Sequence, residues 1–219
     1  MHAMQFTDFH EFAHSVRDVV CEMTPFNVRR PNWSFAHVDL GQTHLQIGDE
    51  GSGTIAEGIC GRNGSIVFVP LTEGIRYAVS GQEIGHHSVA VLGPGSEFCV
   101  ASQDPHVWAA IFVPLQPGSQ AERQRATIAR AQAIDLGPES VSHLRGLVKA
   151  IGKVAADVPK FDFTPAAQTA GDDLLAAAKP FADSLLGTSG TASSQPRLPQ
   201  WEIIHRCRSY LEARQHLPV

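Results

Sequence analysis

Histidine and carboxylate side chains are the first candidates for chemistry in this sequence. His86 and His87 are adjacent, so in a strand they would point to opposite faces and could not hold one metal ion together. His37, His44 and His106 each stand alone. A catalytic metal in a small barrel needs two or three histidines and a carboxylate that converge. The spacing therefore predicts no resident metal or other cofactor.

Nucleophilic catalysis has no matching pattern. The G-x-S-x-G signature is absent, and Ser96 falls on a predicted turn between strands. Cys60 and Cys99 have no histidine at a suggestive spacing, which favours buried structural cysteines. The stretch GDEGSGTIAEG leads into a strand rather than into the helix N-terminus that would receive a phosphate. We expect a protein that is not an enzyme, with a metal-dependent cupin enzyme of unusual ligand set as the alternative.

Aromatic and polar side chains on predicted strands indicate binding instead, because the mouth of a small barrel commonly takes a small molecule. The candidates are Trp33, Phe35, His44, Glu57, Phe68, Arg76 and Trp108. Strand alternation sorts them into two faces but leaves open which face looks inward. An inward Arg76 would favour a carboxylate-bearing effector. The other interpretation, with Arg76 in water and Tyr77 packed inside, is slightly favoured.

Short strands must position these residues. Between Trp33 and Pro114, stretches rich in β-branched and aromatic residues alternate with glycine. They are WSFAHVDL, THLQIG, TIAEGIC, SIVFVPL, IRYAVS, SVAVLG, EFCVAS and VWAAIFVP. So many short strands predict an antiparallel sandwich or barrel. Recurrent proline and glycine elbows favour a cupin-like (jelly-roll) β-barrel.

Helices are predicted on both sides of this block. Apolar residues at helical spacing predict an opening helix from Thr7 to Met23. Capping-box spacing of Ser119 and Glu122 opens a polar helix through Ala133. The fold class is therefore α+β, a barrel with an N-terminal helix and a C-terminal helical layer.

The helical layer contains two further segments. The first is an amphipathic helix over residues 141–155, entered at Pro138. The second follows Pro165 and should kink at Pro180. The apolar stripe of the first helix includes Leu144, Leu147, Val148 and Ile151. It could cover the barrel, supply a two-fold dimer contact, or do both. We expect a homodimer.

The C-terminal end reads as a linker followed by a lone helix. Residues 187–200, GTSGTASSQPRLPQ, have a composition that cannot build a core. Residues 201–219 then form a basic amphipathic pattern that is marginal as an isolated helix and needs a partner. The predicted division is a barrel domain with its helical layer over 1–186, a flexible linker over 187–200 and, over 201–219, an accessory helix that looks like the first element of a second domain.

Bulk properties limit the partners. The 219 residues carry 17 basic and 22 acidic side chains, a formal charge of -5, so any role with DNA should be indirect. No secretory signal and no membrane-spanning apolar run is evident. The four cysteines are far apart, which favours free thiols in a cytoplasmic protein.

Two sets of residues carry a family resemblance. Tyr210 and Leu211, a turn at Gln215 and His216, then Pro218 and Val219 resemble the start of the DNA-binding domain of AraC-type (AraC/XylS) transcriptional regulators. The segments FVPL, YAVSGQEI, VLGPGSEFCVAS and VWAAIFVP are similar, in that order, to the sensor half of a subgroup of these regulators. The matches span about half of the chain, and both helix-turn-helix units of the family are missing.

The resemblance implies that residues 1–186 are a sensor and dimerisation domain and that residues 201–219 are the first helix of a truncated DNA-binding domain. A small-molecule effector in the barrel would favour one arrangement of the protein and so bias how tethered DNA-binding domains are presented. DNA would be contacted only through the missing helix-turn-helix domain. A barrel that dimerises without a ligand is a further alternative.

Overall fold

The computed structural model describes residues 3–115 and 131–187, which form two antiparallel sheets and a helical layer. The strands of the larger sheet are β1 (Met4–Phe6), β3 (Trp33–Leu40), β4 (Thr43–Glu50), β6 (Gly64–Pro70), β9 (Ser88–Leu92), β11 (His106–Pro114) and β12 (Ala131–Asp135). The smaller sheet contains β2 (Val19–Phe26), β5 (Gly53–Cys60), β7 (Tyr77–Val79), β8 (Gln82–Ile84) and β10 (Glu97–Ser102). The helices are α1 (Phe9–Ser15), α3 (Pro138–Asp157) and α4 (Pro165–Gly187), with a 3-10 turn η1 (Phe161–Phe163).

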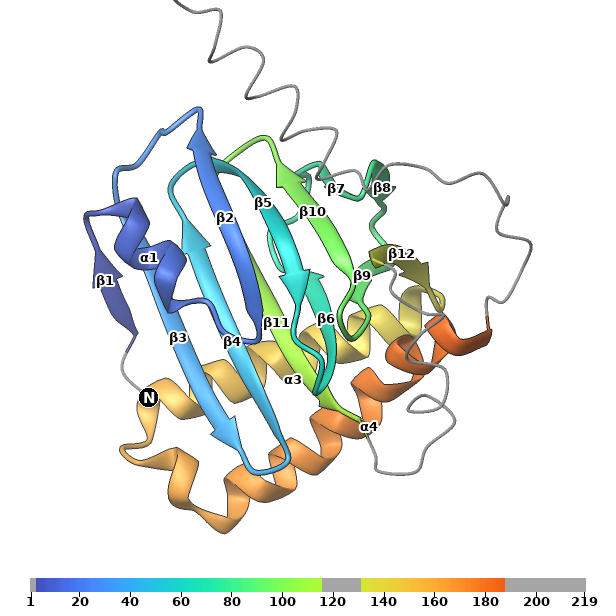
Figure 1. Ribbon diagram of the computed structural model, residues 1–219. Coiled ribbons are helices and arrows are strands. Elements are labelled where there is room, and N and C mark those ends of the chain that lie inside the picture. Colours follow the sequence, from blue (N-terminus) through green and yellow to red (C-terminus); the bar gives the residue numbers. More distant parts are fainter. Residues whose placement is uncertain (1–2, 116–130, 188–219) are drawn as a thin grey trace, which may run out of the picture.

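The elements stack in three layers (Figure 1), with the smaller sheet in front, the larger sheet behind it, and α3 and α4 on the far side. Strand alternation produces this arrangement. On β11, Ala109 and Ile111 belong to the core under the helices, whereas Trp108 and Ala110 belong to the core between the sheets. The larger sheet is therefore covered on both faces.

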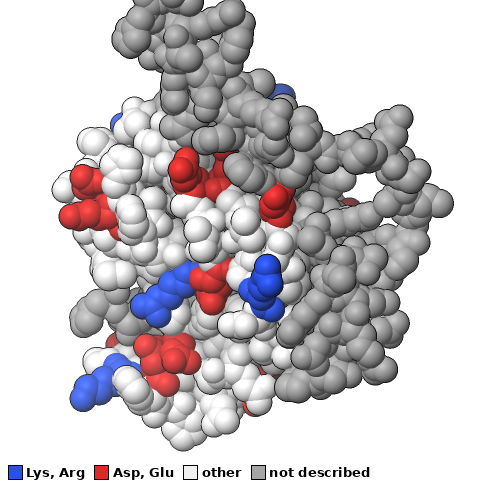
Figure 2. All heavy atoms as spheres, viewed as in Figure 1, with Lys and Arg blue, Asp and Glu red and all other residues white. Residues whose placement is uncertain are grey.

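The face of the molecule seen in Figure 2, with the smaller sheet in front as in Figure 1, carries charges of both signs. Figure 2 shows basic side chains lying beside acidic ones on this face, among many uncharged residues. A protein surface that grips nucleic acid concentrates Lys and Arg instead. The described part of this face therefore lacks the electrostatic character of a DNA-binding surface.

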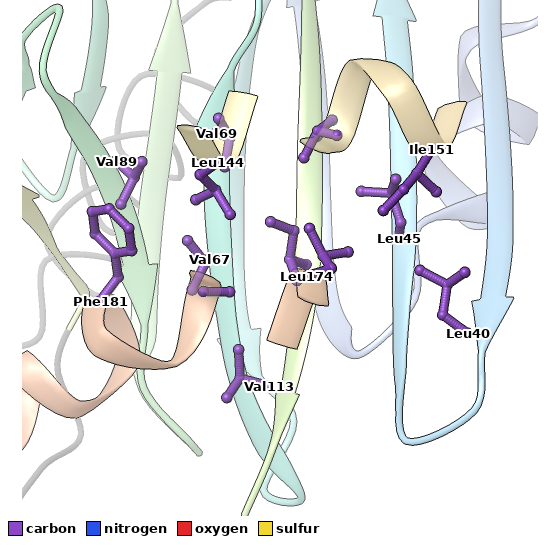
Figure 3. Close-up of a cluster of buried hydrophobic side chains, with 14 of the residues drawn as sticks. Leu40, Leu45, Val67, Val69, Val89, Val113, Leu144, Ile151, Leu174 and Phe181 are labelled. Carbon is purple, nitrogen blue, oxygen red and sulfur yellow. The ribbon is translucent and has the colours of Figure 1, made fainter. Parts of the chain in front are cut away.

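The helices are held by an apolar cluster on the larger sheet (Figure 3). Leu144 of α3 and Leu174 of α4 are fully buried against Val67 and Val69 of β6. Phe181 extends the same cluster toward β9. Complete burial of one such side chain contributes roughly 1.5–3 kcal/mol relative to exposure, so this interface fixes the helical layer on the sheet.

The predicted α+β class is confirmed, but the closed barrel is not. The larger sheet runs as β1-β3-β4-β11-β6-β9-β12 and the smaller as β2-β5-β10-β7-β8, so neither described sheet closes on itself. A sandwich buries the apolar face of each sheet against the other without closure. Alternating strands look the same in a sandwich and in a barrel, which is why the sequence left both possible.

The predicted opening helix is wrong beyond its first two turns. Helix α1 ends at Ser15, and its N-cap is Asp8, whose side chain accepts a hydrogen bond from the His10 backbone N–H at 2.7 Å. Asp18 then has a positive φ of 64°, and the chain continues as strand β2. Valines and methionine at mixed spacing fit both periods, and pairing with β5 decides in favour of the strand.

The C-terminal helical layer is confirmed by α3 and α4, and α4 continues as one helix through Pro180. The polar helix predicted through Ala133 is wrong at its end, because residues 131–135 form β12 and pair with β9. Its earlier part lies outside the described residues. The linker from residue 188 onward and the accessory helix over 201–219 also lie outside them.

Candidate ligand-binding site between the sheets

A partly open hollow with a cavity volume of about 70 Å³ lies between the two sheets. Its lining residues are Val16, Arg17, Val19, Cys21, Met23, Glu50, Thr54, Ala56, Ile66, Phe68, Leu92, Phe98, Val100, Ser102, His106, Trp108 and Ala110. Most are apolar and come from alternate positions of β2, β5 and β10 on one side and of β6, β9 and β11 on the other. The spacing of two along β2, β5, β10, β6 and β11 puts the lining residues of these strands on the inner faces of the sheets.

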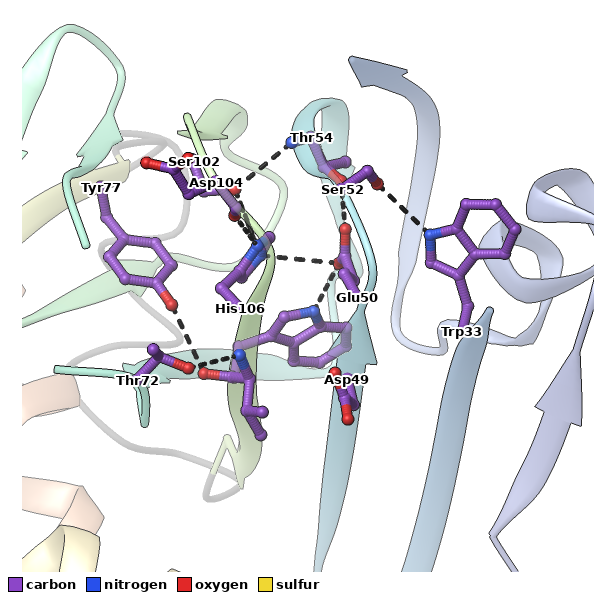
Figure 4. Close-up of polar contacts among 12 residues, drawn as sticks. Trp33, Asp49, Glu50, Ser52, Thr54, Thr72, Tyr77, Ser102, Asp104 and His106 are labelled. Atoms are coloured by element: carbon purple, nitrogen blue, oxygen red, sulfur yellow. Dashed lines mark hydrogen bonds and ion pairs between the residues drawn. The ribbon is translucent and has the colours of Figure 1, made fainter. Parts of the chain in front are cut away.

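The polar groups of the hollow gather around one buried carboxylate (Figure 4). Glu50, at the end of β4, is 1% exposed. Trp108 donates its indole Nε1–H to Glu50 Oε1 at 2.6 Å, and the Thr54 hydroxyl hydrogen-bonds to Glu50 Oε2. Both donors to this carboxylate are neutral.

His106 lies directly across the strand pair from Glu50. Its Nδ1 is 2.9 Å from the Asp104 backbone oxygen and 2.9 Å from the Ser102 hydroxyl. A carbonyl oxygen can only accept, so Nδ1 carries the proton that this contact needs. Nε2 is 3.8 Å from Glu50 Oε1, too far for a hydrogen bond. The Tyr77 ring packs edge-on against the imidazole, 5.3 Å between centroids.

A glycine makes room for the tryptophan in this arrangement. Gly48 is opposite Trp108 in the β4–β11 register. A Cβ added at Gly48 would lie 2.4 Å from Trp108 Cε2, closer than two carbon atoms can approach. The indole therefore lies flat over β4 and reaches Glu50, two residues further along the same face.

Burial dominates the electrostatics of the site. It raises the pKa of the Glu50 carboxyl above its ordinary value, and the nearby His106 acts in the opposite direction. Burial, with a smaller effect of Glu50, also raises the pKa of the Cys21 thiol to about 11. Cys21 therefore stays a neutral thiol at pH 7 and contributes apolar wall rather than reactivity.

Two of the seven sequence-predicted ligand residues, Phe68 and Trp108, line the hollow. Trp33 and Phe35 are buried beside it in the core between the sheets. The Trp33 indole donates to the Ser52 hydroxyl at 3.3 Å and packs on Phe9. The structure thus places all four aromatic candidates between the sheets, two as lining of the hollow and two as core.

The other three candidates lie away from the hollow. His44 is 2.6 Å from an Asp18 carboxylate oxygen and stacks on Phe112. Glu57 is on the outer face of the smaller sheet, next to the Cys99 thiol. Arg76 is exposed and lines a separate, polar hollow before β7, while Tyr77 is buried, as the favoured interpretation of that pair had it.

The structure adds residues that the sequence interpretation missed. Glu50 sits in a glycine-rich acidic stretch that reads as a loop, and His106 was noted only as an isolated histidine. Their pairing depends on the β4–β11 register. Cys21 and Met23 were assigned to a helix. Alternation in the segment VVCEM was the available signal for their inward position.

The predicted dimerisation residues are placed inside the protomer. Leu144, Val148 and Ile151 are buried in the core under the helices, and Leu147 is partly buried against it. Their side chains already contact the chain's own sheet, so a second subunit would have to meet other side chains. A homodimer stays a prediction.

The cysteines of the described residues are unpaired by disulfides. Cys21, Cys60 and Cys99 are free thiols, and burial raises the pKa of Cys60 to about 12. Cys207 lies outside the described residues. Within residues 3–115 and 131–187, no three His, Cys, Asp or Glu side chains come together as metal ligands. The described helices include none that is long and apolar enough to span a membrane.

The chain resembles a known regulator in structure. Neither a family model nor a curated protein sequence matches it. The crystal structure of the AraC-like transcriptional activator CuxR is similar to it, with a TM-score of 0.55 and 10% sequence identity, over 99% of this chain and 81% of that one. At this identity the similarity establishes the fold. The resemblance to AraC-type regulators drawn from the sequence is thus confirmed at the level of fold.

Proposed function

We propose that this chain is the effector-sensing and dimerisation part of an AraC-type transcriptional regulator and acts in the cytoplasm. The observation that carries the proposal is the hollow between the sheets, with apolar walls and one buried polar end. Such a combination is typical of small-molecule sites, where apolar contact supplies affinity and few polar groups fix orientation. The fold shared with an AraC-like activator supports the same function.

In this proposal the effector acts by population shift and no chemical step is involved. A molecule that fills the hollow contacts both sheets at once, so it stabilises arrangements in which the sheets are held at one spacing. The helical layer rests on the larger sheet and would pass this preference on to a helix-turn-helix domain, which makes the contact with DNA. The predicted accessory helix over 201–219 would begin that domain.

Retention of a small molecule by the purified chain tests the proposal. The chain is incubated with a small-molecule extract, separated from free molecules, denatured, and the released compounds are identified by mass spectrometry. Ala56→Leu, which fills the hollow from β5, should abolish retention. Ala101→Leu on β10, pointing to the outer face of the same sheet, is the matched control and should retain the compound.

Circular dichroism melting of both variants controls for folding. Failure of the unchanged chain to retain any compound, or equal retention by folded Ala56→Leu, would contradict an effector site between the sheets.

A further inference from the structure

We propose that the site between the sheets takes a small organic cation, an apolar body with one amino group that pairs with Glu50. This inference rests on the proposed function, because it names the chemical class of the effector. It is carried by the polar end of the hollow and by the composition of its walls.

Glu50 is a buried acidic group whose one ion-pair partner among the described residues is His106, at 3.8 Å, and this imidazole carries a positive charge only when it is protonated. Its hydrogen-bond partners, Trp108 and Thr54, are uncharged. A buried carboxylate is costly unless a positive charge pairs with it, and here a ligand can supply that charge.

His106 Nδ1 makes its hydrogen-bond contacts with groups other than Glu50. Its Nδ1 faces the Asp104 carbonyl and the Ser102 hydroxyl, which hold the ring in place. The ring also packs edge-on against Tyr77, and its Nε2 faces Glu50 Oε1 at 3.8 Å, beyond hydrogen-bond distance. Because Glu50 also lines the hollow, a ligand there can bring its own cationic group to the carboxylate.

The walls are mostly apolar and suit an organic cation, although the basic residue Arg17 also lines the hollow. Phe68 and Trp108 both line the hollow, with ring centroids 5.8 Å apart. Aromatic faces attract cations, and the attraction is strongest where water is excluded. Ala56, Val100 and Ala110 add small aliphatic surface for the rest of the ligand.

Other head groups fit less well. A ligand carboxylate would be repelled by Glu50. A hydroxyl could donate one hydrogen bond to it but would leave the buried charge without compensation. Among ligands that share one skeleton, the amine should therefore bind most tightly, the alcohol less tightly and the acid least tightly.

Three probes with the same phenylethyl skeleton test this ranking: phenethylamine, 2-phenylethanol and 3-phenylpropanoate. Each is titrated at neutral pH into the full chain, with calorimetric Kd and melting temperature as the readouts. The amine should raise the melting temperature and bind roughly tenfold or more tightly than the alcohol, since it adds a buried charge pair.

Two matched glutamate variants locate the effect. Glu50→Gln keeps the shape and the acceptor for Trp108 but removes the charge, so the preference for amine over alcohol should disappear. Glu57→Gln makes the same change on the outer face of β5 and should leave the preference intact. The three-probe comparison on the unchanged chain stands even if Glu50→Gln fails to fold.

The outcomes separate this inference from the proposed function. If the alcohol or the acid binds at least as tightly as the amine, the proposal of a cationic effector is contradicted and the hollow remains a ligand site. If the amine preference persists in Glu50→Gln, the proposed pairing of the amino group with Glu50 is contradicted. If none of the probes binds, both the cation and the ligand site are contradicted.

Discussion

At the residue scale, Trp108 and Thr54 hold the buried Glu50 carboxylate in place by hydrogen bonds. Burying a charged carboxylate normally lowers the stability of the folded protein more than burying a neutral group does. Here two donors and the edge of His106 offset part of that cost. The same arrangement presents a negative group to the hollow, so stability and ligand chemistry depend on the same few side chains.

Replacing the indole donor tests its importance for stability. Trp108→Phe removes the hydrogen bond to the carboxylate and should lower the free energy of unfolding by about 2 kcal/mol or more, because bonds to charged groups are worth about 1.5–3 kcal/mol. Urea denaturation measures the change. Trp33→Phe is the matched control. The Trp33 indole donates to the neutral Ser52 hydroxyl, so removing this hydrogen bond should lower the free energy of unfolding by less. Equal losses in the two variants would contradict a charged Glu50 acceptor.

The dependence of stability on pH tests the environment of Glu50. Burial raises its pKa in the folded state. A carboxyl whose folded pKa lies above the unfolded value stabilises the protein most at low pH, and this contribution is lost as pH rises through the folded pKa. The Glu50→Gln variant has no titrating carboxyl at this position, so its stability does not include this pH-dependent contribution. The unfolding free energy of the variant minus that of the unchanged chain should therefore increase from about pH 4 to pH 8; a difference independent of pH would contradict a perturbed Glu50.

At the element scale, close packing of α4 on the larger sheet sets the helical layer. Gly171 of α4 lies on Leu40 of β3, where an added Cβ would be 2.2 Å from the Leu40 carbonyl oxygen. A Cβ added at Gly146 of α3 would have no other atom within 4 Å among those compared. One glycine is therefore required by packing, whereas the other only lowers helix propensity.

Alanine substitution at the two glycines should have opposite effects. Gly171→Ala should destabilise the protein by about 1–3 kcal/mol, because the helix must move off the strand. Gly146→Ala should stabilise it by up to about 1 kcal/mol through helix propensity. Thermal unfolding followed by circular dichroism compares them. A stabilising Gly171→Ala would show that α4 does not pack on β3 in this way.

Elements with one clear period could be predicted from the sequence, and those with a mixed pattern could not. The segment WSFAHVDL matches β3 residue for residue, and helix α3 begins at the predicted Pro138. The stretch that forms β2 fits helical and strand periods alike, and only its pairing with β5 decides. The site needs still more, since the partnership of Glu50 with His106 arises from the β4–β11 register, which local sequence does not specify.

At the scale of the whole molecule, the proposed homodimer must use surfaces that the protomer leaves open. Near the junction of α3 and η1, Val154 and Val158 are exposed and the Phe163 side chain is 87% exposed. These residues lie in the helical layer, on the opposite side of the molecule from the smaller sheet. A two-fold contact there would leave the hollow between the sheets free.

Substitution of Phe163 tests this placement. Phe163→Ser should shift the chain from dimer to monomer in size-exclusion chromatography with light scattering, because an exposed aromatic residue is the kind of side chain that dominates interfaces. Val20→Ser, at an 83% exposed valine on the smaller sheet, is the control and should leave the dimer unchanged. A monomeric unchanged chain, or a dimer lost only with Val20→Ser, would contradict the placement.

The proposed function requires that a small molecule binds between the two sheets. A crystal structure of the chain with its retained compound is the decisive measurement. We expect ligand density enclosed by β2, β5 and β10 on one side and β6 and β11 on the other, with the polar group of the ligand against Glu50. Density for the compound at any other place, with the space between the sheets filled by side chains, would contradict it.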